Sequence, residues 1–379
     1  MSTEYLGFQL RPATTADNQA LIDMTASAPM PGKIRMYLER SPDFFVVPRL
    51  MDGTTETDVA VSPGSEVTGV QTMTLCRRYY KGREIPVMHW GDLRVIGNRQ
   101  GGKAGSALIL RGKERLIESG AHLATAEVLE GNAGARNIIK RISALEPVNE
   151  VVSGGNYEIH QILPLRSLHR LPRGSTVRRA TPDDLETICS LLNEFYQDYF
   201  AVPRFDREFF TDLFARSPGL DIGAFRILER NGVAEACSGL WDQNGFRRTV
   251  VEKTGRAKSL LRSLHPVVRA PLGLIPLPPE GGSFVQMKAC FFACRRGRER
   301  SLRDLIRHMV RETRNQGKAH FLQIAFHERE PALAALKGLL RLMSRTEIYY
   351  YLPVSRKKER FFRNEDLPAL LPWAEFSIS

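Results

Sequence analysis

The sequence predicts a mixed α/β fold made of two copies of one unit, and three observations lead to this prediction. The chain has 379 residues, which is long for one domain and makes two the better expectation. Its hydrophobic content of 42% and charged content of 25% are ordinary for a globular protein, which excludes fibrous and disordered classes. Several segments of the first half also recur in the second half in the same order.

The first repeated segment opens each half. Leu10–Asp17 reads LRPATTAD and Val177–Asp184 reads VRRATPDD, so Arg, Ala, Thr and Asp recur in register. In each copy a short strand leads into a threonine, an acidic first turn and an apolar helical pattern, which is typical of a helix start. We therefore expect a strand followed by an amphipathic helix at both places.

The middle and the end of each half also match. The middle follows the order strand, polar turn, helix, strand: Val87–Val95, Gly105–Glu118 and a strand to Val128 in the first half, and Phe284–Ala293, Leu302–Arg314 and a strand through Phe326 in the second. Each half then ends on an alternating strand that a proline stops, Tyr157–Pro164 and Thr346–Pro353. Two copies of one α/β unit explain this order.

The junction of the halves is expected in a polar, basic linker that Pro164, Pro172 and Gly174 punctuate. This places a first domain at residues 1–165, a linker at 166–174, a second domain at 175–355 and a C-terminal tail at 356–379. A basic insertion over residues 245–282 interrupts the second domain.

The cysteines and the hydropathy pattern bear on location. No apolar run is long enough to cross a bilayer, and no secretory signal is visible. The five cysteines stand at irregular positions, which predicts buried thiols in a reducing cytoplasm and neither a disulfide framework nor a metal site.

The positive charge is concentrated in the second half. Residues 245–320 carry 17 Lys and Arg against 5 Asp and Glu, which accounts for the whole net charge of +12. An acidic partner and a solvated basic surface both explain this excess. Residues 245–282 have the pattern of a basic amphipathic helix followed by an extended proline segment, which would lie on an anionic membrane, guard a cleft or pack on its own domain. No nucleic acid is expected, because the Arg-rich residues 295–314 lack interleaved aromatics.

The turn over Arg94–Gly105 is the leading candidate for a functional site. It follows a strand and precedes a helix that is expected to begin at Ala104–Ser106. Gly101 and Gly102 allow a ligand to approach the backbone closely, and the amides of a helix start carry partial positive charge. Pyrophosphate fits such a corner, although a tight turn without a ligand has the same pattern.

Two short motifs give this turn a family context. The pattern Arg99-x-x-Gly102-x-Ala104 resembles the acyl-CoA motif of the GNAT acetyltransferase superfamily, and Asn132-x-x-Ala135 resembles the helix start beside its pantetheine arm. The resemblance covers residues 7–165 with motifs and residues 175–354 in outline. It implies two tandem GNAT-like domains, each with a mixed, mostly antiparallel sheet and flanking helices.

The resemblance implies acetyl-CoA, or another acyl-CoA, as the cofactor of the first half. The strand before the turn would splay from its neighbour and open a V-shaped slot, in which backbone groups near Arg94 and Ile96 pair with the pantetheine. Asn132 would contact the pantetheine or a water. The expected cofactor-binding residues are Arg94, Val95, Ile96, Arg99, Gln100, Gly101, Gly102, Lys103, Ala104, Gly105, Ser106 and Asn132.

Three residues are candidates for catalysis. Asp92 is the first choice for a general base, because it shares a strand face with Arg94, and His89 on the opposite face is the second. A surface ion pair and a half-buried histidine are the corresponding structural explanations. Ile139 stands where the superfamily often has a tyrosine acid, so either Tyr157 donates the proton or the thiolate leaves without help.

The second half has lost the phosphate corner, because Arg298–Arg300 fill the tight part of its turn and no Gly-x-Gly or Gly-x-Ala precedes the helix. No acyl-CoA site is expected there. In the first half, residues 29–44 stand where the superfamily builds its acceptor loop. Arg35, Arg40 and Asp43 in this segment would either grip a substrate or cap and pair a second short helix.

The expected function is acyl transfer from acetyl-CoA or another acyl-CoA to a small-molecule or peptide amine, with a general base. The alternative is a non-catalytic protein whose GNAT scaffold binds CoA or presents the basic second half to a partner. The fold alone does not identify the acceptor.

Overall fold

The computed structural model describes residues 3–27, 35–97, 99–144, 149–166, 170–253, 272–353, 357 and 359–379. In the first half the elements are β1 (Thr3–Tyr5), β2 (Phe8–Pro12), α1 (Asn18–Ser27), β3 (Arg35–Glu39), β4 (Thr54–Val61), β5 (Val67–Tyr80), β6 (Arg83–Val95), α2 (Arg99–Glu118), β7 (Leu123–Leu129), α3 (Ala133–Ala144) and β8 (Asn149–Ile162). In the second half they are β9 (Ser175–Arg179), α4 (Leu185–Tyr196), α5 (Arg207–Arg216), β10 (Phe225–Arg230), β11 (Val233–Asp242), β12 (Arg248–Lys253), β13 (Ser283–Phe284), β14 (Gln286–Cys294), α7 (Glu299–Gln316), β15 (Phe321–His327) and β16 (Arg341–Pro353).

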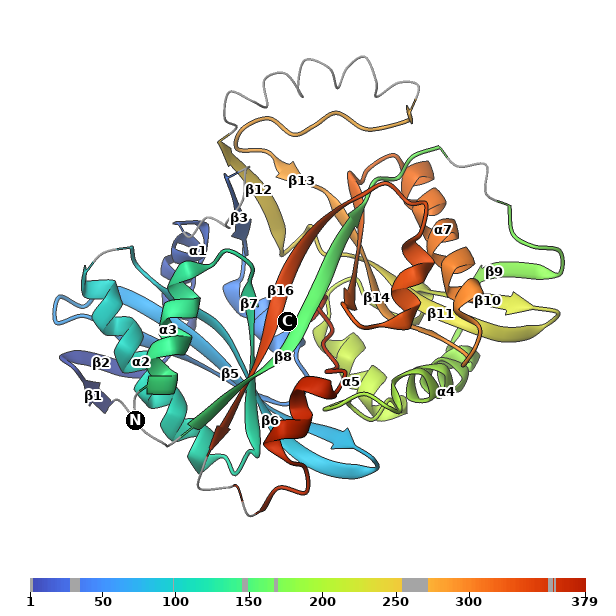
Figure 1. Cartoon of the computed structure of the whole chain (residues 1–379). Helices are drawn as coiled ribbons and strands as arrows, with labels where there is room; N and C mark the ends of the chain where they lie inside the picture. The colour runs from blue at the N-terminus through green and yellow to red at the C-terminus, as the bar shows by residue number, and fades with distance from the viewer. Residues whose placement is uncertain are drawn as a thin grey trace.

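The two halves share one sheet because they exchange their last strands (Figure 1). The sheet has 13 strands in the order β1-β2-β4-β5-β6-β7-β16-β8-β15-β14-β11-β10-β9. Thus β16, from the second half, lies between β7 and β8, and β8, from the first half, pairs with β15. The sheet is mixed and mostly antiparallel, as expected. The domain boundary at residues 166–174 stays a prediction, since the exchange makes each half depend on a strand of the other.

The capped turns that open both halves confirm the internal repeat. Arg11 donates two hydrogen bonds of 2.7 Å to Asp17, and Arg178 donates two of the same length to Asp184. In each copy the carboxylate also accepts hydrogen bonds from the amide and hydroxyl of a threonine. The hydrogen bonds from Arg11 lower the pKa of Asp17 to about 2. The repeated sequence therefore encodes a repeated local structure.

The central strand of each half carries the same irregularity. Asp92 in β6 has φ 53° and Phe291 in β14 has φ 45°, which is left-handed backbone that residues other than glycine seldom adopt. Both residues lie where the register with the neighbouring strand shifts. A β-bulge of this kind bends the strand and changes which face later side chains occupy.

The faces of the sheet are covered by different elements. In the first half α2 and α3 cover one face, and in the second half α7 covers the equivalent face (Figure 1). On the opposite face of the first half α1 packs on β4 and β5, and the part around Val87 is buried against the second half. One buried cluster there joins Val87 and Tyr157 to Phe200, Tyr350 and residues of the C-terminal segment. The core that positions the site is therefore built from both halves.

The C-terminal segment, expected as a tail over residues 356–379, is part of this core. Phe362, Leu367 and Ile378 are buried. The amide of Phe200 donates to Leu371 O at 2.7 Å, and the amide of Trp373 donates back to Phe200 O at 2.9 Å. Residues 359–379 therefore pack against elements of both halves, and the expected C-terminal tail is part of the folded core over this range.

The basic insertion departs from the expected helix in its first part. Residues 248–253 form the strand β12, which pairs with β3 and β13 in a second, three-stranded sheet. Residues 254–271, where most of the helix was expected, lie outside the described residues. Within residues 29–44, for which a second short helix was one of the two expectations, Arg35–Glu39 form the strand β3. The expected acceptor loop, residues 29–44, and the basic insertion, residues 245–282, thus pair with each other through β3 and β12.

Two further predictions concern the cysteines and membrane-spanning segments. All five cysteines are free and buried, which confirms that they are structural thiols in the fold. Among the helices in the described ranges, none combines the length and the hydropathy that crossing a membrane requires.

Candidate active site

The central feature of the first half is a slot between two parallel strands. β6 and β7 pair only where residues 87–89 lie opposite residues 123–125. Beyond this point β6 continues to Val95 and β7 continues to Leu129, each paired with its outer neighbour instead. The strands therefore separate toward their carboxyl ends, as the superfamily resemblance implied. Unpaired backbone groups on the inner edges of such a slot are ready to pair with an extended ligand.

Two helix starts stand at the open end of the slot. α2 begins at Arg99, just after β6, and α3 begins at Ala133, just after β7. Asn132 caps α3, since its Oδ1 accepts a hydrogen bond of 3.0 Å from the amide of Ala135. First-turn amides carry partial positive charge and favour anions. The open end of the slot is therefore suited to a phosphate-bearing ligand.

The helix after the slot begins earlier than the sequence suggested. α2 starts at Arg99 and not at Ala104–Ser106, so the Gly-Gly pair lies in its first turns. A Cβ on Gly101 would meet Ile96 O at 1.9 Å, so this glycine is required by the chain's own close packing. A Cβ on Gly102 would meet no heavy atom of the described residues within 4 Å. Gly102, and not Gly101, is therefore the glycine that a ligand can approach.

The other predicted cofactor residues have varied environments. Ala104 is fully buried and Lys103 is exposed. Gly105 packs close to Val95, and the hydroxyl of Ser106 donates to Gly102 O at 3.1 Å. The side chains of Arg99 and Gln100 lie outside the described residues, although their backbone forms the first turn of α2.

The backbone register identifies which groups face the slot. The amide of Ile96 donates to Thr68 O at 3.0 Å on the β5 side. Because successive amides of a strand point to opposite neighbours, Val95 directs its backbone groups into the slot while Arg94 and Ile96 face β5. Of the expected cofactor-binding residues, Val95 is therefore better placed than Arg94 and Ile96 to pair with a ligand in the slot.

The bulge at Asp92 resets the two faces of β6. Between the pairs Val70–Arg94 and Thr72–Gly91, β6 has one residue more than β5. Trp90 and Leu93 consequently both pack toward α2, although three positions separate them. His89, Asp92 and Arg94 then lie on the opposite face, toward the second half. The expectation that His89 and Asp92 occupy different faces is wrong, because it assumed an unbroken alternation.

Asp92, the first candidate for a base, is held in a buried ion pair. Arg40 donates to its two oxygens at 2.7 and 2.6 Å, and Arg40 is only 3% exposed. Burial raises the pKa of Asp92, but the charge of Arg40 and its hydrogen bonds outweigh this and lower the pKa to about 2. A carboxylate so stabilised is a poor proton acceptor at neutral pH. The arrangement therefore favours a positioning role for Asp92.

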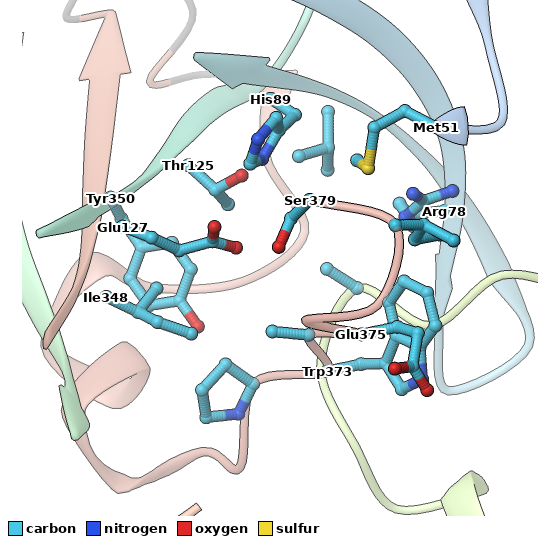
Figure 2. A pocket seen from close by; sticks show the side chains of 15 residues that line it. Met51, Arg78, His89, Thr125, Glu127, Ile348, Tyr350, Trp373, Glu375 and Ser379 are labelled. Atoms are coloured by element: carbon cyan, nitrogen blue, oxygen red, sulfur yellow. The ribbon is translucent and has the colours of Figure 1, made fainter. Parts of the chain in front are cut away.

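A pocket beside the slot brings together a different set of polar groups. His89 on β6 lies opposite Thr125 on β7, which lies opposite Tyr350 on β16. Glu127 and Ile348 form the next pair along the same two strands. All five line the pocket, and Figure 2 shows the His89 imidazole and the Glu127 carboxylate turned toward one hollow. His89 and Glu127 are thus proton acceptors placed beside the narrow end of the slot.

Glu127 was missed by the sequence reasoning, although a signal was present. It belongs to the strand that was expected to end at Val128, and it has the same side-chain parity as Thr125. A carboxylate on the strand that forms the other edge of the slot is as well placed as one on β6.

The C-terminal segment forms the opposite wall of the pocket. Trp373, Glu375 and Ser379 line it (Figure 2). Glu375 is fixed because it accepts a hydrogen bond of 2.7 Å from the amide of Phe291, at the bulge of the second half. Burial raises the pKa of Glu375. The pocket is therefore closed by groups that no sequence pattern places near the first half.

Tyr157, the candidate acid, is not in the slot. Its hydroxyl donates to Pro372 O at 2.6 Å and accepts from the amide of Ala374 at 3.1 Å. It is 4% exposed, and burial raises its pKa well above the ordinary value. Both hydrogen bonds attach the C-terminal segment to β8. We therefore correct its assignment from proton donor to structural tether.

The equivalent slot of the second half is closed by aromatic rings. β14 and β15 pair only where residues 286–288 lie opposite 321–323, so these strands also separate. The rings of Phe292 and Phe326 then meet with centroids 4.7 Å apart. Tyr196 donates to Phe292 O at 3.0 Å, which occupies a backbone group of the slot edge. The second slot thus retains the geometry of the first but not its opening.

The acceptor-loop residues have structural partners. Arg35 pairs with Glu252 at 3.0 Å, Arg40 pairs with Asp92, and Asp43 caps a short 3₁₀ turn by accepting from the amide of Phe45. Arg40 is therefore the residue that joins this segment to the edge of the slot.

Comparison with known proteins identifies the fold. No protein-family model matches the chain, and no curated protein sequence matches it. Solved structures do: Saccharomyces cerevisiae N-myristoyltransferase with bound myristoyl-CoA aligns at 9% identity with TM-score 0.61 over 92% of this chain and 84% of that one. A GCN5-related N-acetyltransferase from Sphaerobacter thermophilus aligns at 14% identity with TM-score 0.57, over 92% and 96%.

A third solved structure extends this set. It is the GCN5-related glucosamine N-acetyltransferase region of a fungal multi-domain GH3 β-N-acetylglucosaminidase, at 11% identity with TM-score 0.59, over 93% of this chain and 38% of that one. At these identities the likeness establishes the fold alone.

Proposed function

We propose that this chain, which has the GNAT-superfamily N-acyltransferase fold, is an enzyme that transfers an acyl group from an acyl-CoA to an amine. The observation that carries the proposal is the separation of β6 from β7 beneath two helix starts. The slot suits an extended ligand such as the pantetheine arm of acyl-CoA. The partial positive charge at its open end suits a pyrophosphate. No other part of the described structure combines these two properties.

The cofactor would occupy the slot as an added strand. The backbone of Val95 faces the slot and would pair with an amide of the pantetheine, in the way that a peptide extends a sheet edge. The pyrophosphate would lie at the start of α2, where Gly102 leaves room for close approach. The thioester would then lie toward the closed end of the slot, near the level of His89 and Thr125.

The acceptor would enter from the face that is shared with the second half. His89 and Glu127 line the pocket on that face, and we propose that one of them is the general base. It takes a proton from the amine, the nitrogen attacks the thioester carbonyl carbon, and the carbon–sulfur bond breaks. The thiolate then receives a proton, so charge balances over the cycle. Holding amine and thioester together would supply much of the rate, and no dedicated acid is required.

The acyl group is left open by this geometry, and the comparisons suggest the range to test. The yeast N-myristoyltransferase structure holds myristoyl-CoA, whereas two of the other similar proteins are named as N-acetyltransferases. Acyl-CoA thioesters from acetyl to myristoyl therefore form the first panel.

The test is release of free CoA thiol from each acyl-CoA in the presence of amines and short peptides. Thiol release that depends on an amine and yields the acylated amine by mass spectrometry supports the proposal. Binding of acyl-CoA without product for any amine would instead favour a non-catalytic scaffold that senses CoA. A folded protein that neither binds acyl-CoA nor releases thiol contradicts both.

A further inference from the structure

Beside the slot lies a group of basic side chains from four separate segments. Arg40 follows β3, Arg94 lies on β6, Arg247 precedes β12 and Lys288 lies on β14. Asp92 lies among them and interacts electrostatically with Arg40, Arg94 and Arg247. We call Arg40, Arg94, Arg247 and Lys288 the basic cluster. It brings both halves together at the slot, on the face opposite α2.

The basic cluster has more positive than negative charge. Among the described residues Asp92 is its one direct carboxylate partner, and both of its oxygens accept hydrogen bonds from Arg40. Glu127 and Glu375 also face it, but they act at longer range on Arg247 and Lys288 and form no ion pair with either. Within the described residues, Arg94 and Arg247 have no ion-pair partner. Nε of Arg94 and Nη1 of Arg247 are buried and lack hydrogen-bond partners.

Other buried arginines of this chain are paired. Arg78, 3% exposed, pairs with Asp52, and Arg226, 5% exposed, donates to Glu312 at 2.6 and 2.8 Å. Buried guanidinium groups usually have such partners, because an unpaired buried charge is costly. Arg94 and Arg247 are half-buried and have no such carboxylate partner; among the described residues Arg216 is in a similar state, but Arg94 and Arg247 lie together beside the slot.

Burial and mutual repulsion disfavour the charged forms of two members of the basic cluster. Burial and the charge of Arg40 lower the pKa of Arg247 to about 10, and burial together with Arg247 lowers the pKa of Lys288 well below its ordinary value. A bound anion would offset this repulsion by supplying the missing acceptor. The partial exposure of Arg94, Asp92 and Arg247 shows that solvent reaches the cluster.

We propose that the basic cluster binds an anionic group of the amine acceptor, a carboxylate or a phosphate close to the amine. This inference rests on the proposed acyl transfer, and it specifies the acceptor class. The CoA phosphates are not its ligand, because they would lie at the start of α2 and the cluster faces the other side of β6. Guanidinium groups suit both carboxylate and phosphate oxygens.

The experiment titrates sodium acetate and sodium phosphate separately into the full chain saturated with CoA, with sodium chloride at equal ionic strength as the reference. Thermal stability is followed for the wild type, for Arg247→Gln and Arg94→Gln, and for Arg77→Gln as control. Arg77 is an exposed arginine paired with Glu84 on the β5–β6 hairpin. Acetate and phosphate distinguish the two candidate anions.

One of the two anions is expected to stabilise the wild type and Arg77→Gln with a saturable dependence. In Arg247→Gln and Arg94→Gln the apparent Kd should rise at least tenfold. Equal responses in all four proteins, or no response beyond chloride in the wild type, would overturn the inference. The rise in melting temperature that CoA alone produces in each protein is measured first, and it separates this outcome from failure of the proposed function.

The same distinction is expected in catalysis. Amine pairs that differ by one anion, such as glycine with glycinamide and phosphoethanolamine with ethanolamine, are compared with acyl-CoA saturating. At least one anionic member should exceed its neutral partner in kcat/KM, and Arg247→Gln should remove the difference. If the neutral amines react as well as the anionic ones, acyl transfer stands and the proposed acceptor class is wrong.

Discussion

Arg40 and Asp92 form a bidentate ion pair at 2.7 and 2.6 Å, although one follows β3 and the other lies in the bulge of β6. The pair connects the segment expected to contact the acceptor with the strand expected to contact the cofactor. Asp92 makes this pair from the left-handed backbone of the bulge, which the second half repeats at Phe291. A carboxylate with this partner is a poor proton acceptor, which favours a stabilising role over that of a base.

Replacing one member of this pair should therefore affect stability first. Arg40→Gln leaves a buried carboxylate without its partner, and we expect a loss of about 3–5 kcal/mol in the free energy of unfolding. Urea denaturation measures it. Arg49→Gln is the control, because Arg49 is an exposed arginine paired with Asp43 nearby. Similar losses for both variants would show that the buried pair is unimportant.

The low pKa of Asp92 predicts a pH dependence. Its pKa in the folded chain is about 2, below the ordinary value of 3.8, so the unfolded chain binds the proton more tightly. The stability this group contributes is present above pH 4 and is lost as the pH falls toward 2, by about 2–3 kcal/mol. Asp92→Asn should show a correspondingly shallower decline between pH 4 and 2. Parallel curves for the two proteins would contradict the assignment.

The two neighbouring glycines of α2 should respond oppositely to alanine. Gly101→Ala places a Cβ at 1.9 Å from Ile96 O and should cost at least about 2 kcal/mol of stability. Gly102→Ala meets open space within a helix and should gain about 0.5–1 kcal/mol. Thermal unfolding of the two variants compares them directly. Equal effects would mean that the turn before α2 is not packed as described.

The variant Tyr157→Phe distinguishes a structural role of the Tyr157 hydroxyl from a role as proton donor. The variant loses hydrogen bonds to Pro372 and Ala374, so we expect a stability loss of about 1–3 kcal/mol. Below its melting temperature it should retain the wild-type pH profile of acyl transfer. A large fall in kcat with unchanged stability would restore Tyr157 as the proton donor.

His89→Gln and Glu127→Gln identify the base. We expect one of them to lower kcat by about 10²–10⁴-fold while acyl-CoA binding is unchanged. The pH–rate profile of that variant should lose its acidic limb, which a purely structural change would leave in place. Normal kcat in both variants would exclude this pocket as the source of the base.

The sequence was sufficient for the features that depend on local pattern. The repeat at Leu10–Asp17 and Val177–Asp184, the order of strands and helices, and the corner between β6 and α2 all follow from short-range signals. The fold class could be predicted for this reason. The predicted start of α2 was too late in the chain, because Gly101 and Gly102 favour a loop in isolation. In the structure both lie in the helix, where Gly101 packs closely on Ile96.

The features that were missed depend on distant partners. The bulge at Asp92 is defined by the register with β5, and without it the parity of β6 places His89 and Asp92 on opposite faces. The exchange of β8 and β16 is a choice between strands far apart in the chain. Tyr350 and Glu375 reach the pocket only through this exchange and through the C-terminal segment, whereas Glu127 lies on β7 of the first half itself. A local pattern contains no information about either.

Calorimetric titration with acetyl-CoA tests the central claim most directly. One site per chain is expected, because the first slot is open and Phe292 and Phe326 close the second. Gly102→Asp should abolish binding without loss of stability, since a first-turn carboxylate suits the helix but repels a pyrophosphate. Two sites per chain would contradict the closure of the second slot, and wild-type affinity in Gly102→Asp would contradict acyl-CoA binding in the slot between β6 and β7.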